Sequence, residues 1–273
     1  MSLAKAGFVL GIKPVSILRP HEQTIPEHVE ELVSEMRRDG VQKDPIMIDV
    51  ESATVLDGMH RLAACEALRI ENAVCCSVDY SSRAVSLGRW ARVYTVPTGG
   101  SAAELLGRFG ITRRVTLAEA FDALDNKDTG LAALTSDAAY LPGQRLGLGP
   151  AFEIIEELDG YAESKKWDRR FVSEDDVDVP LQSSRSLVVL VRRLGKDDVV
   201  SSARSGKLFP CKTSMHRIDP RPVAVDFPLG ELNRATSASL REALSGRTER
   251  LLPADSMYEG RRYKERLLLL NQE

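Results

Sequence analysis

The sequence predicts an α+β protein of two domains, and three observations lead to this prediction. The chain has 273 residues, which is more than the usual length of a single domain. Up to about residue 80, short apolar runs typical of strands alternate with segments of helical periodicity. From Ser81 onward this alternation is weaker, which indicates a change of domain. We therefore expect a small N-terminal domain over residues 1–82, packed on a second α/β domain over residues 83–273, with the active cleft between them.

The composition is typical of a soluble globular protein of the cytoplasm. Hydrophobic residues make up 43% of the chain and charged residues 28%. No apolar run approaches the length of a membrane span, and Met1–Lys5 lacks the apolar core of a secretory signal. The net charge of −3 gives no overall attraction to nucleic acid, so we expect neither a nucleic acid nor a membrane as partner. The cysteines have no zinc-ligand spacing and suit a reducing compartment; they are Cys65, Cys75, Cys76 and Cys211.

Local patterns predict each element of the first domain in order. Apolar residues at 8–10 and at 15–18 predict two short strands. Thr24 is placed to cap a helix that has Pro26 in its first turn and that ends at Gly40. The remaining patterns predict strands at 46–50, 54–56 and 73–78, and a helix that ends near Leu68.

The second domain has fewer clear patterns. Residues 187–191 are apolar without interruption, which predicts a buried strand. The tail from Arg262 to Leu270 suits a strand with one buried side. Helical periodicity predicts helices at 102–109, 117–124, 150–158 and 197–204.

The most informative stretch is the five-residue turn Asp57-Gly58-Met59-His60-Arg61, which joins a predicted strand to a predicted helix. Gly58 permits a sharp turn because it has no Cβ. The start of a helix presents unpaired backbone N–H groups and the positive end of the helix dipole. His60 and Arg61 add further donors, so the turn suits a phosphate group. The same five residues also fit an ordinary turn whose His and Arg are solvated.

Two further polar clusters contain residue types that suit the handling of an anionic substrate. Arg19–Gln23 lies between a predicted strand and a predicted helix, and its Glu22 suits a general base or a magnesium ligand. Phe209–Arg217 carries a lysine, two hydroxyl side chains, a histidine and an arginine, which suit phosphate or carboxylate oxygens. Each cluster also fits a plainer interpretation. Glu22 fits a solvated carboxylate in a loop, and Phe209–Arg217 fits a polar loop between two elements.

These three motifs together resemble those of a known family. Asp57–Arg61 resembles the signature turn of the ParB/sulfiredoxin-like fold, whose members bind a nucleotide at that turn. Pro20-His21-Glu22 and the late loop Pro210–His216 resemble two loops of one branch, the free L-serine kinases of archaea and of a bacterial siderophore pathway. Order and approximate spacing agree over residues 13–217, and Arg262–Leu267 resembles the closing segment of the siderophore-pathway member.

The resemblance implies a kinase that phosphorylates free L-serine to O-phospho-L-serine, with Mg²⁺ and with ATP or ADP as the phosphoryl donor. It implies that Glu22 is the catalytic base. Asp57, at the end of a predicted strand, suits a catalytic residue that binds the magnesium ion or orders its waters. Met59 stands where the archaeal kinases have a histidine. The implied nucleotide-binding residues are Gly58, Met59, His60 and Arg61, and the implied substrate-binding residues are His21, Lys212, Thr213, Ser214 and His216.

Other proteins of the ParB/sulfiredoxin-like fold have functions that require different residues. Sulfiredoxin chemistry needs a cysteine just before the His-Arg pair, and Met59 has no thiolate to offer. The alternative to the kinase is a ParB-like regulator that responds to nucleotide, or a DNA-binding protein, without catalysis. The acidic balance, and the lack of an evident helix-turn-helix after the first domain, weigh against DNA binding.

Overall fold

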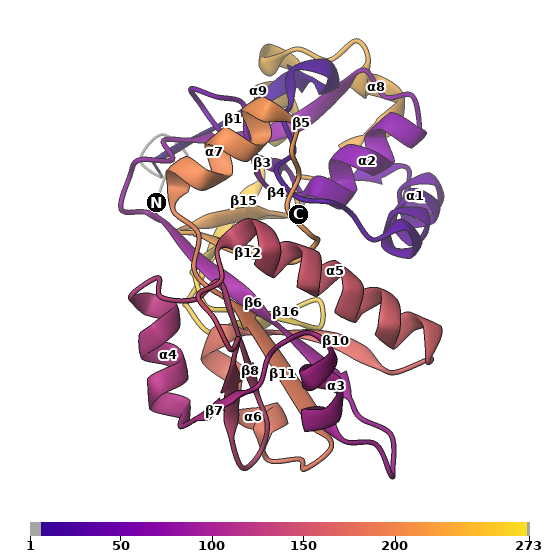
Figure 1. The fold of residues 1–273 in the computed structure, drawn as a ribbon. Helices are drawn as coiled ribbons and strands as arrows, with labels where there is room; N and C mark the ends of the chain where they lie inside the picture. The colour runs from indigo at the N-terminus through magenta and orange to yellow at the C-terminus, as the bar shows by residue number, and fades with distance from the viewer. Residues whose placement is uncertain (1–6, 272–273) are drawn as a thin grey trace. The chain divides into compact units, whose positions relative to one another are not determined.

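The computed structural model describes residues 7–271 and divides into two compact units (Figure 1). The first unit comprises the chain up to Ser86, Gly195–Cys211 and the chain from His216 onward. The second unit comprises Leu87–Leu194 and Lys212–Met215. Helices and sheets occur in both units, which confirms the predicted α+β class.

This division differs from the expected domains 1–82 and 83–273, because most of the chain after residue 194 belongs to the first unit. The reason is pairing between segments far apart in the sequence. Phe227–Pro228 (β14) pairs with Val41–Gln42 (β2). The hydroxyl of Ser237 accepts a hydrogen bond from the backbone N–H of Ile12 at 3.2 Å. Such contacts leave no periodic signal in the sequence.

The first unit is built on a four-stranded sheet. Its strands are Phe8–Pro14 (β1), Ile46–Asp49 (β3), Val55–Asp57 (β4) and Asn72–Val78 (β5). Their order is β1-β5-β3-β4, with β3 parallel to β5 and the other pairs antiparallel. All four residues of β3 are buried, so this strand lies in the core of the unit.

Two helices flank the signature turn in the first unit. Pro26–Asp39 (α1) has Pro26 at its first position and ends at Gly40, whose φ of 70° is left-handed, as the sequence predicts. Met59–Ala67 (α2) begins directly after Gly58. The two helices pack against each other (Figure 1). Helix α1 therefore lies beside the helix that the signature turn opens.

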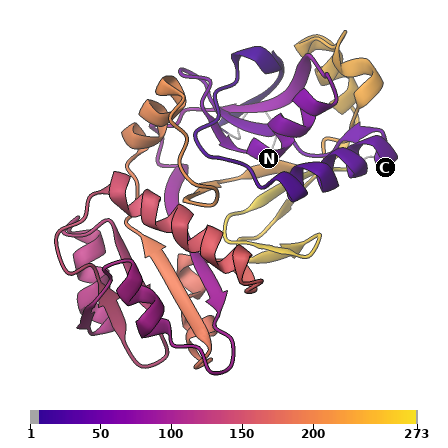
Figure 2. The same ribbon diagram turned by 45° about the vertical axis from the view of Figure 1, so that its right-hand side comes forward.

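The C-terminal part of the first unit adds small sheets and short helices, and Figure 2 shows its last strands in yellow. Arg221–Val223 (β13) pairs in parallel with Leu267–Asn271 (β18), which also pairs with Thr248–Leu252 (β15). Ser256–Tyr258 (β16) and Arg261–Tyr263 (β17) form a two-stranded ribbon. The helices of this part are Lys196–Ser205 (α7), Leu229–Leu232 (α8) and Ser237–Leu244 (α9).

Three local predictions are wrong. Val15–Ile17 forms a 3-10 turn instead of a strand over 15–18, since the N–H of Leu18 donates to the carbonyl of Val15. Thr24 does not cap α1, because Ile25 occupies the N-cap position. The tail is not one strand: between β17 and β18 the chain bends where the backbone and side chain of Arg266 bond to Asp219.

The second unit centres on a larger sheet. Its strands are Val85–Thr95 (β6), Arg113–Val115 (β7), Leu131–Leu134 (β8), Ala139–Leu141 (β9), Arg169–Ser173 (β10) and Ser186–Val191 (β11). Of Ser214–Ile218 (β12), only Ser214 and Met215 belong to this unit. The order is β10-β6-β11-β8-β9-β7, and β12 pairs with β6. The helices are Ala102–Arg108 (α3), Leu117–Asp125 (α4), Leu148–Ser164 (α5) and Asp178–Leu181 (α6), with a 3-10 turn at Glu174–Asp176.

Strand β11 is buried on both faces of this sheet. Leu187, Val189 and Val191 lie in one apolar core together with residues of α3 and α5. Val188 and Leu190 lie in a second core together with residues of α4. Successive side chains of a strand point to opposite faces, so a strand covered on both faces is apolar throughout. The predicted buried strand at 187–191 is confirmed.

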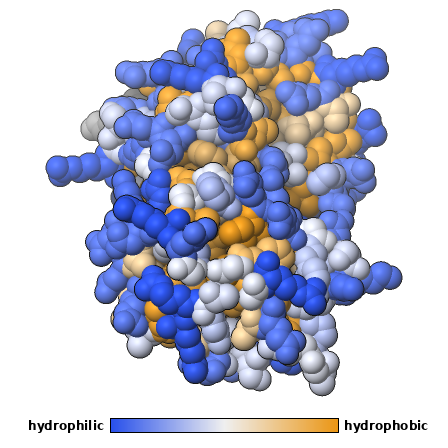
Figure 3. Space-filling model, in the orientation of Figure 1, coloured by the Kyte–Doolittle hydropathy of each residue, from blue (hydrophilic) through white to orange (hydrophobic). Residues whose placement is uncertain are grey.

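Hydrophilic side chains project over much of the surface shown in Figure 3, with apolar residues visible in patches between them. None of the helices described within residues 7–271 is long and apolar enough to cross a membrane. The expectation drawn from Met1–Lys5 concerns residues outside the described range.

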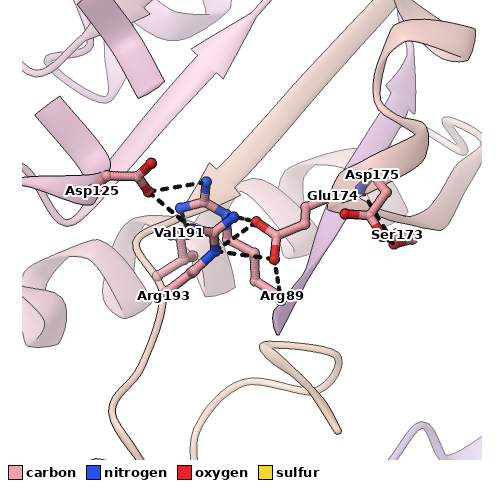
Figure 4. A network of polar contacts seen from close by, with 7 residues as sticks. All are labelled: Arg89, Asp125, Ser173, Glu174, Asp175, Val191 and Arg193. Atoms are coloured by element: carbon pink, nitrogen blue, oxygen red, sulfur yellow. Dashed lines mark hydrogen bonds and ion pairs between the residues drawn. The ribbon is translucent and has the colours of Figure 1, made fainter. Parts of the chain in front are cut away.

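A cluster of two arginines, Arg89 and Arg193, and two carboxylates, Asp125 and Glu174, lies within the second unit (Figure 4). The side chain of Arg89 is 1% exposed, and its Nε lies 2.9 Å from Oε2 of Glu174. Arg193 donates to the same carboxylate at 3.0 Å, and Nη1 of Arg89 donates to the carbonyl of Val191. Burial lowers the pKa of Arg89, while Glu174 acts in the opposite direction. Glu174 is therefore the main group that compensates a buried guanidinium.

We predict that Glu174→Gln lowers the free energy of unfolding by about 3–5 kcal/mol, because it leaves Arg89 buried without its closest carboxylate. Asp137→Asn is the matched control, since the Arg114–Asp137 pair has side chains 64% and 72% exposed. That change should cost less than about 1 kcal/mol. Urea unfolding followed by circular dichroism measures both. Equal, small losses for the two variants would contradict the assigned role of Glu174.

Candidate active site

The signature turn has the predicted strand–turn–helix geometry. Gly58 follows β4 with a φ of 101°, and its carbonyl accepts the first helical hydrogen bond of α2, from Leu62, at 2.8 Å. A Cβ at Gly58 would lie 2.9 Å from Nη1 of Arg61 and 3.5 Å from Cα of Ile46. Glycine is therefore required here for two reasons: the backbone is left-handed, and there is no room for a Cβ atom.

The guanidinium of Arg61 folds back over this turn. Its Nη1 donates to the carbonyl of Pro45 at 2.8 Å, and its Nη2 lies 3.7 Å from a carboxylate oxygen of Asp44. The side chain is 20% exposed. Arg61 thus ties the start of α2 to the residues just before β3, and it keeps a positive charge beside the turn.

The imidazole of His60 bonds to the start of α1. Its Nε2 accepts a hydrogen bond from the backbone N–H of Ile25 at 3.0 Å. Ile25 is the N-cap residue of α1 and makes no side-chain cap of its own, so this bond ties the start of α1 to the first turn of α2. Sequence reasoning treated His60 only as a donor to phosphate. In the structure one ring nitrogen is an acceptor committed to α1.

The thiols of the first unit are buried away from the turn. Met59 occupies the first helical position of α2. Burial raises the pKa of Cys65 to about 11 and that of Cys75 to about 12, and it also raises that of Cys76. None of these three groups has the lowered pKa that a reactive thiolate needs. This agrees with the exclusion of sulfiredoxin chemistry made from Met59.

Asp57 is paired with a buried arginine that the sequence did not single out. Nη1 of Arg221 donates to Oδ2 of Asp57 at 2.5 Å, and its Nε donates to Oε1 of Glu265 at 2.6 Å. Its Nη2 donates to the carbonyl of His216 at 2.9 Å. Burial opposes the charge of Arg221, but the two carboxylates outweigh burial and raise its pKa. Arg221 therefore stays charged and holds Asp57 at the end of β4.

A magnesium ion fits the donor chemistry of Asp57. Its side chain is 36% exposed, and carboxylate oxygens are the ligands that Mg²⁺ prefers. Magnesium is usually bound through one or two carboxylates together with substrate phosphates. Within residues 7–271 there is no cluster of three or more His, Cys, Asp or Glu side chains suited to a metal. The assignment of Asp57 as a magnesium ligand stays a prediction.

The Pro-His-Glu loop is buried and ordered rather than solvated. His21 is 0% and Glu22 4% exposed. Nδ1 of His21 donates to the carbonyl of Val55 at 2.7 Å, which fixes the ring against β4. Backbone bonds between His21, Gln23 and Phe209 bind this loop to the start of the late loop. Nε2 of His21 lies 3.7 Å from Oε1 of Glu22, an ion-pair distance when the imidazole is protonated.

His216 lies against His21 in the same buried cluster. The two ring centroids are 5.3 Å apart and nearly perpendicular. Nε2 of His216 lies 2.7 Å from the phenol oxygen of Tyr80. Burial lowers the pKa of His216 well below its usual 6.5, and His21 acts in the same direction. Tyr80 was missed by sequence reasoning because a lone tyrosine after a strand carries no motif.

The other residues of the late loop belong to the second unit. Lys212 has a positive φ of 55°, and its ammonium lies 5.2 Å from the centroid of the Trp90 ring, within cation–π range. Thr213 and Ser214 are 2% and 6% exposed. The structure therefore divides the predicted set. It groups His21, Glu22 and His216 in the first unit, and it places Lys212–Ser214 in the second.

Comparisons with known proteins agree with these motifs. No protein-family model matches the chain. A segment of 76 residues is 36% identical to a ParB-like protein of Sulfolobus acidocaldarius, which covers 28% of this chain and 38% of that protein. A segment of 87 residues is 31% identical to an ATP-dependent L-serine kinase of Staphylothermus marinus, which covers 29% and 34%. The chain thus spans little more than a third of the length of these relatives.

Longer matches have lower identity. The ADP-dependent L-serine kinase SerK of Thermococcus kodakarensis is 21% identical over 221 residues, which cover 79% of this chain and 89% of that protein. A free serine kinase variant in complex with AMP superposes with a TM-score of 0.69 at 20% identity, over 84% of this chain and 95% of that one. This chain has the fold of the free serine kinases. SbnI of Staphylococcus aureus has the same fold, with a TM-score of 0.65 at 16% identity over 85% and 92% of the two chains. The predicted resemblance is confirmed at the level of the fold.

We predict that Gly58→Ala destabilises the serine-kinase fold by more than the about 1–2 kcal/mol of a left-handed alanine, because the new Cβ also collides with Arg61. Gly206→Ala is the matched control. Gly206 has a φ of 70°, but no heavy atom lies within 4 Å of the Cβ position. Thermal and urea unfolding of both variants measure the difference. A smaller loss for Gly58→Ala than for Gly206→Ala would contradict the crowding at this turn.

Proposed function

We propose that the protein is a kinase that transfers a phosphoryl group from a nucleotide to the hydroxyl of free L-serine. The shared fold of 84% of the chain with a free serine kinase supports this proposal. The names of two relatives, which are L-serine kinases, support the same substrate. The family motifs also occur here in the expected chain order.

The observation that carries the proposal is the burial of Glu22 beside His21. A carboxylate in a solvated loop would be exposed, but Glu22 is 4% exposed and held in a loop that pairs with Phe209. Burying a carboxylate costs free energy that partners must compensate, so a buried glutamate occupies a position built specifically for it. A positioned carboxylate is what the hydroxyl of serine requires, because a hydroxyl is a poor nucleophile at neutral pH.

In the proposed reaction the serine oxygen attacks the terminal phosphorus of the nucleotide. A new oxygen–phosphorus bond forms, the bond to the leaving nucleotide breaks, and Glu22 accepts the hydroxyl proton. Such transfers depend mainly on positioning and charge stabilisation. Arg61 contributes positive charge beside the first turn of α2, where the helix dipole also favours phosphate.

The binding residues keep the roles that the family resemblance implies. Gly58, Met59, His60 and Arg61 bind the nucleotide, and His21, Lys212, Thr213, Ser214 and His216 bind the serine or the transferred group. Mg²⁺, bound through Asp57, would neutralise charge on the phosphate oxygens. The relatives named ATP-dependent and ADP-dependent leave either nucleotide as the donor in this proposal.

A second candidate function is a regulator that responds to nucleotide without catalysis. The match of 36% identity to a ParB-like protein favours it. The turn would then bind nucleotide as a switch, and Glu22 would be dispensable. Serine turnover in the presence of Mg²⁺ supports the kinase, whereas a salt-sensitive DNA mobility shift without turnover supports the regulator.

We predict that Glu22→Gln lowers serine-dependent phosphoserine formation by about 10²–10⁴-fold, because the amide keeps the shape of the side chain but is a very weak base. Nucleotide affinity measured without metal should hardly change. Glu27→Gln, an exposed glutamate in the first turn of α1, is the matched control and should keep full activity. A folded Glu22→Gln protein with wild-type turnover would remove Glu22 from the mechanism.

We predict that Lys212→Ala raises the KM for serine or slows transfer by about tenfold or more, the effect of losing a hydrogen bond to a charged group. Nucleotide affinity, measured by calorimetry, should stay close to wild type. Lys207→Ala removes an exposed lysine of the preceding segment and serves as the control. Unchanged serine kinetics in Lys212→Ala would exclude the late lysine from the substrate site.

A further inference from the structure

The buried pair Tyr80–His216 determines which nitrogen of His216 carries a proton. The phenol oxygen of Tyr80 lies 2.7 Å from Nε2 of His216, and both residues are almost fully buried, at 4% and 5% exposure. Burial raises the pKa of Tyr80, so the phenol keeps its proton. Burial also keeps His216 neutral, and the cations of Arg221 and Lys196 act in the same direction, whereas Asp57 opposes them.

A count of donors and acceptors assigns the tautomer. A buried phenol proton needs an acceptor, and among the described residues Nε2 of His216 is the partner of the Tyr80 hydroxyl. If Nε2 accepts from Tyr80, the single proton of neutral His216 is on Nδ1. The opposite arrangement would leave both the phenol proton and Nδ1 without partners. The favoured arrangement leaves only one group unsatisfied.

That group is Nδ1 of His216, which is buried and has no hydrogen-bond partner among the described residues. A buried donor without an acceptor is destabilising, so such groups call for an explanation such as a ligand or a water. The rings of His21 and Tyr80 have centroids 5.3 and 5.4 Å from that of His216, and the guanidinium of Arg221 donates to the backbone carbonyl of His216. An oxygen with negative charge is the acceptor that best suits an N–H donor in these surroundings.

Tyr80 itself is held in place by a separate interaction. The ammonium of Lys196, at the start of α7, donates to the carbonyl of Tyr80 at 2.6 Å and to that of Ser82 at 3.0 Å. It also lies 5.1 Å from the centroid of the Tyr80 ring. These contacts involve the backbone and the ring, so removal of the hydroxyl alone leaves them in place.

We propose that Tyr80 is a positioning residue: it fixes His216 as the Nδ1–H tautomer, and that N–H donates to an anionic oxygen of the bound substrate. This inference rests on the proposed function. The oxygen belongs either to the serine carboxylate or to the transferred phosphoryl group, which share the same acceptor chemistry.

The first test needs no activity. Nitrogen NMR of the protein labelled with ¹⁵N-histidine, with His216→Gln to assign the resonance, should show a protonated Nδ1 and an unprotonated Nε2. Tyr80→Phe should increase the share of the Nε2–H form. A wild-type His216 protonated on Nε2, or a tautomer that Tyr80→Phe leaves unchanged, would overturn the proposal even if the kinase assay succeeds.

The second test is kinetic. Tyr80→Phe should lower kcat/KM for serine by about tenfold, the effect of losing one hydrogen bond of about 1.4 kcal/mol. A raised KM for serine with kcat kept assigns the oxygen to the carboxylate, and a lowered kcat with KM kept assigns it to the phosphoryl group. The control is Tyr94→Phe, which removes a hydroxyl bonded to Asp159 at 2.6 Å in the second unit.

The outcomes separate the two proposals. Wild-type turnover with unchanged KM and kcat in Tyr80→Phe would overturn the positioning role, as would an equal effect of Tyr94→Phe. No turnover in the wild type would refute the kinase instead. The NMR result would then still decide whether Tyr80 fixes the tautomer of His216.

Discussion

The first unit depends on the buried guanidinium of Arg221. It joins Asp57 at the signature turn to Glu265 near the last strand, and it also bonds to the carbonyl of His216. A buried charge is strongly destabilising unless partners surround it, so these three segments must come together for any of them to be stable. The constraint explains why residues 216–271 belong to the same unit as residues 7–86.

The same constraint organises the candidate site. Asp57 is held at the end of β4 by Arg221, and the ring of His21 is fixed on the same strand through Val55. Ser202 of α7 donates to the carbonyl of His21 at 3.0 Å, so the late segment also supports the early loop. Groups from distant parts of the sequence are thereby placed before any ligand binds, which is the condition for catalysis by positioning.

The sequence predicted the features that depend on neighbouring residues and the motifs that resemble those of a known family. The turn at Gly58, the end of α1 at Gly40 and the buried strand at 187–191 follow from backbone sterics and apolar patterns, and the structure has all three. Arg221 and Tyr80 could not be found in this way, because their roles arise from contacts with residues far away in the chain. Glu265 had an indirect signal, since it lies in the closing segment that resembles a relative.

The central claim is that the hydroxyl oxygen of free serine attacks the nucleotide phosphorus. The most direct measurement uses L-serine labelled with ¹⁸O in its hydroxyl, with Mg²⁺ and either ATP or ADP, and analyses the product by mass spectrometry. The account predicts phosphoserine that retains the label in its bridging oxygen, formed in equal amount to the nucleotide consumed. Folded protein that yields no phosphoserine with either donor, or a product that has lost the label, would contradict it.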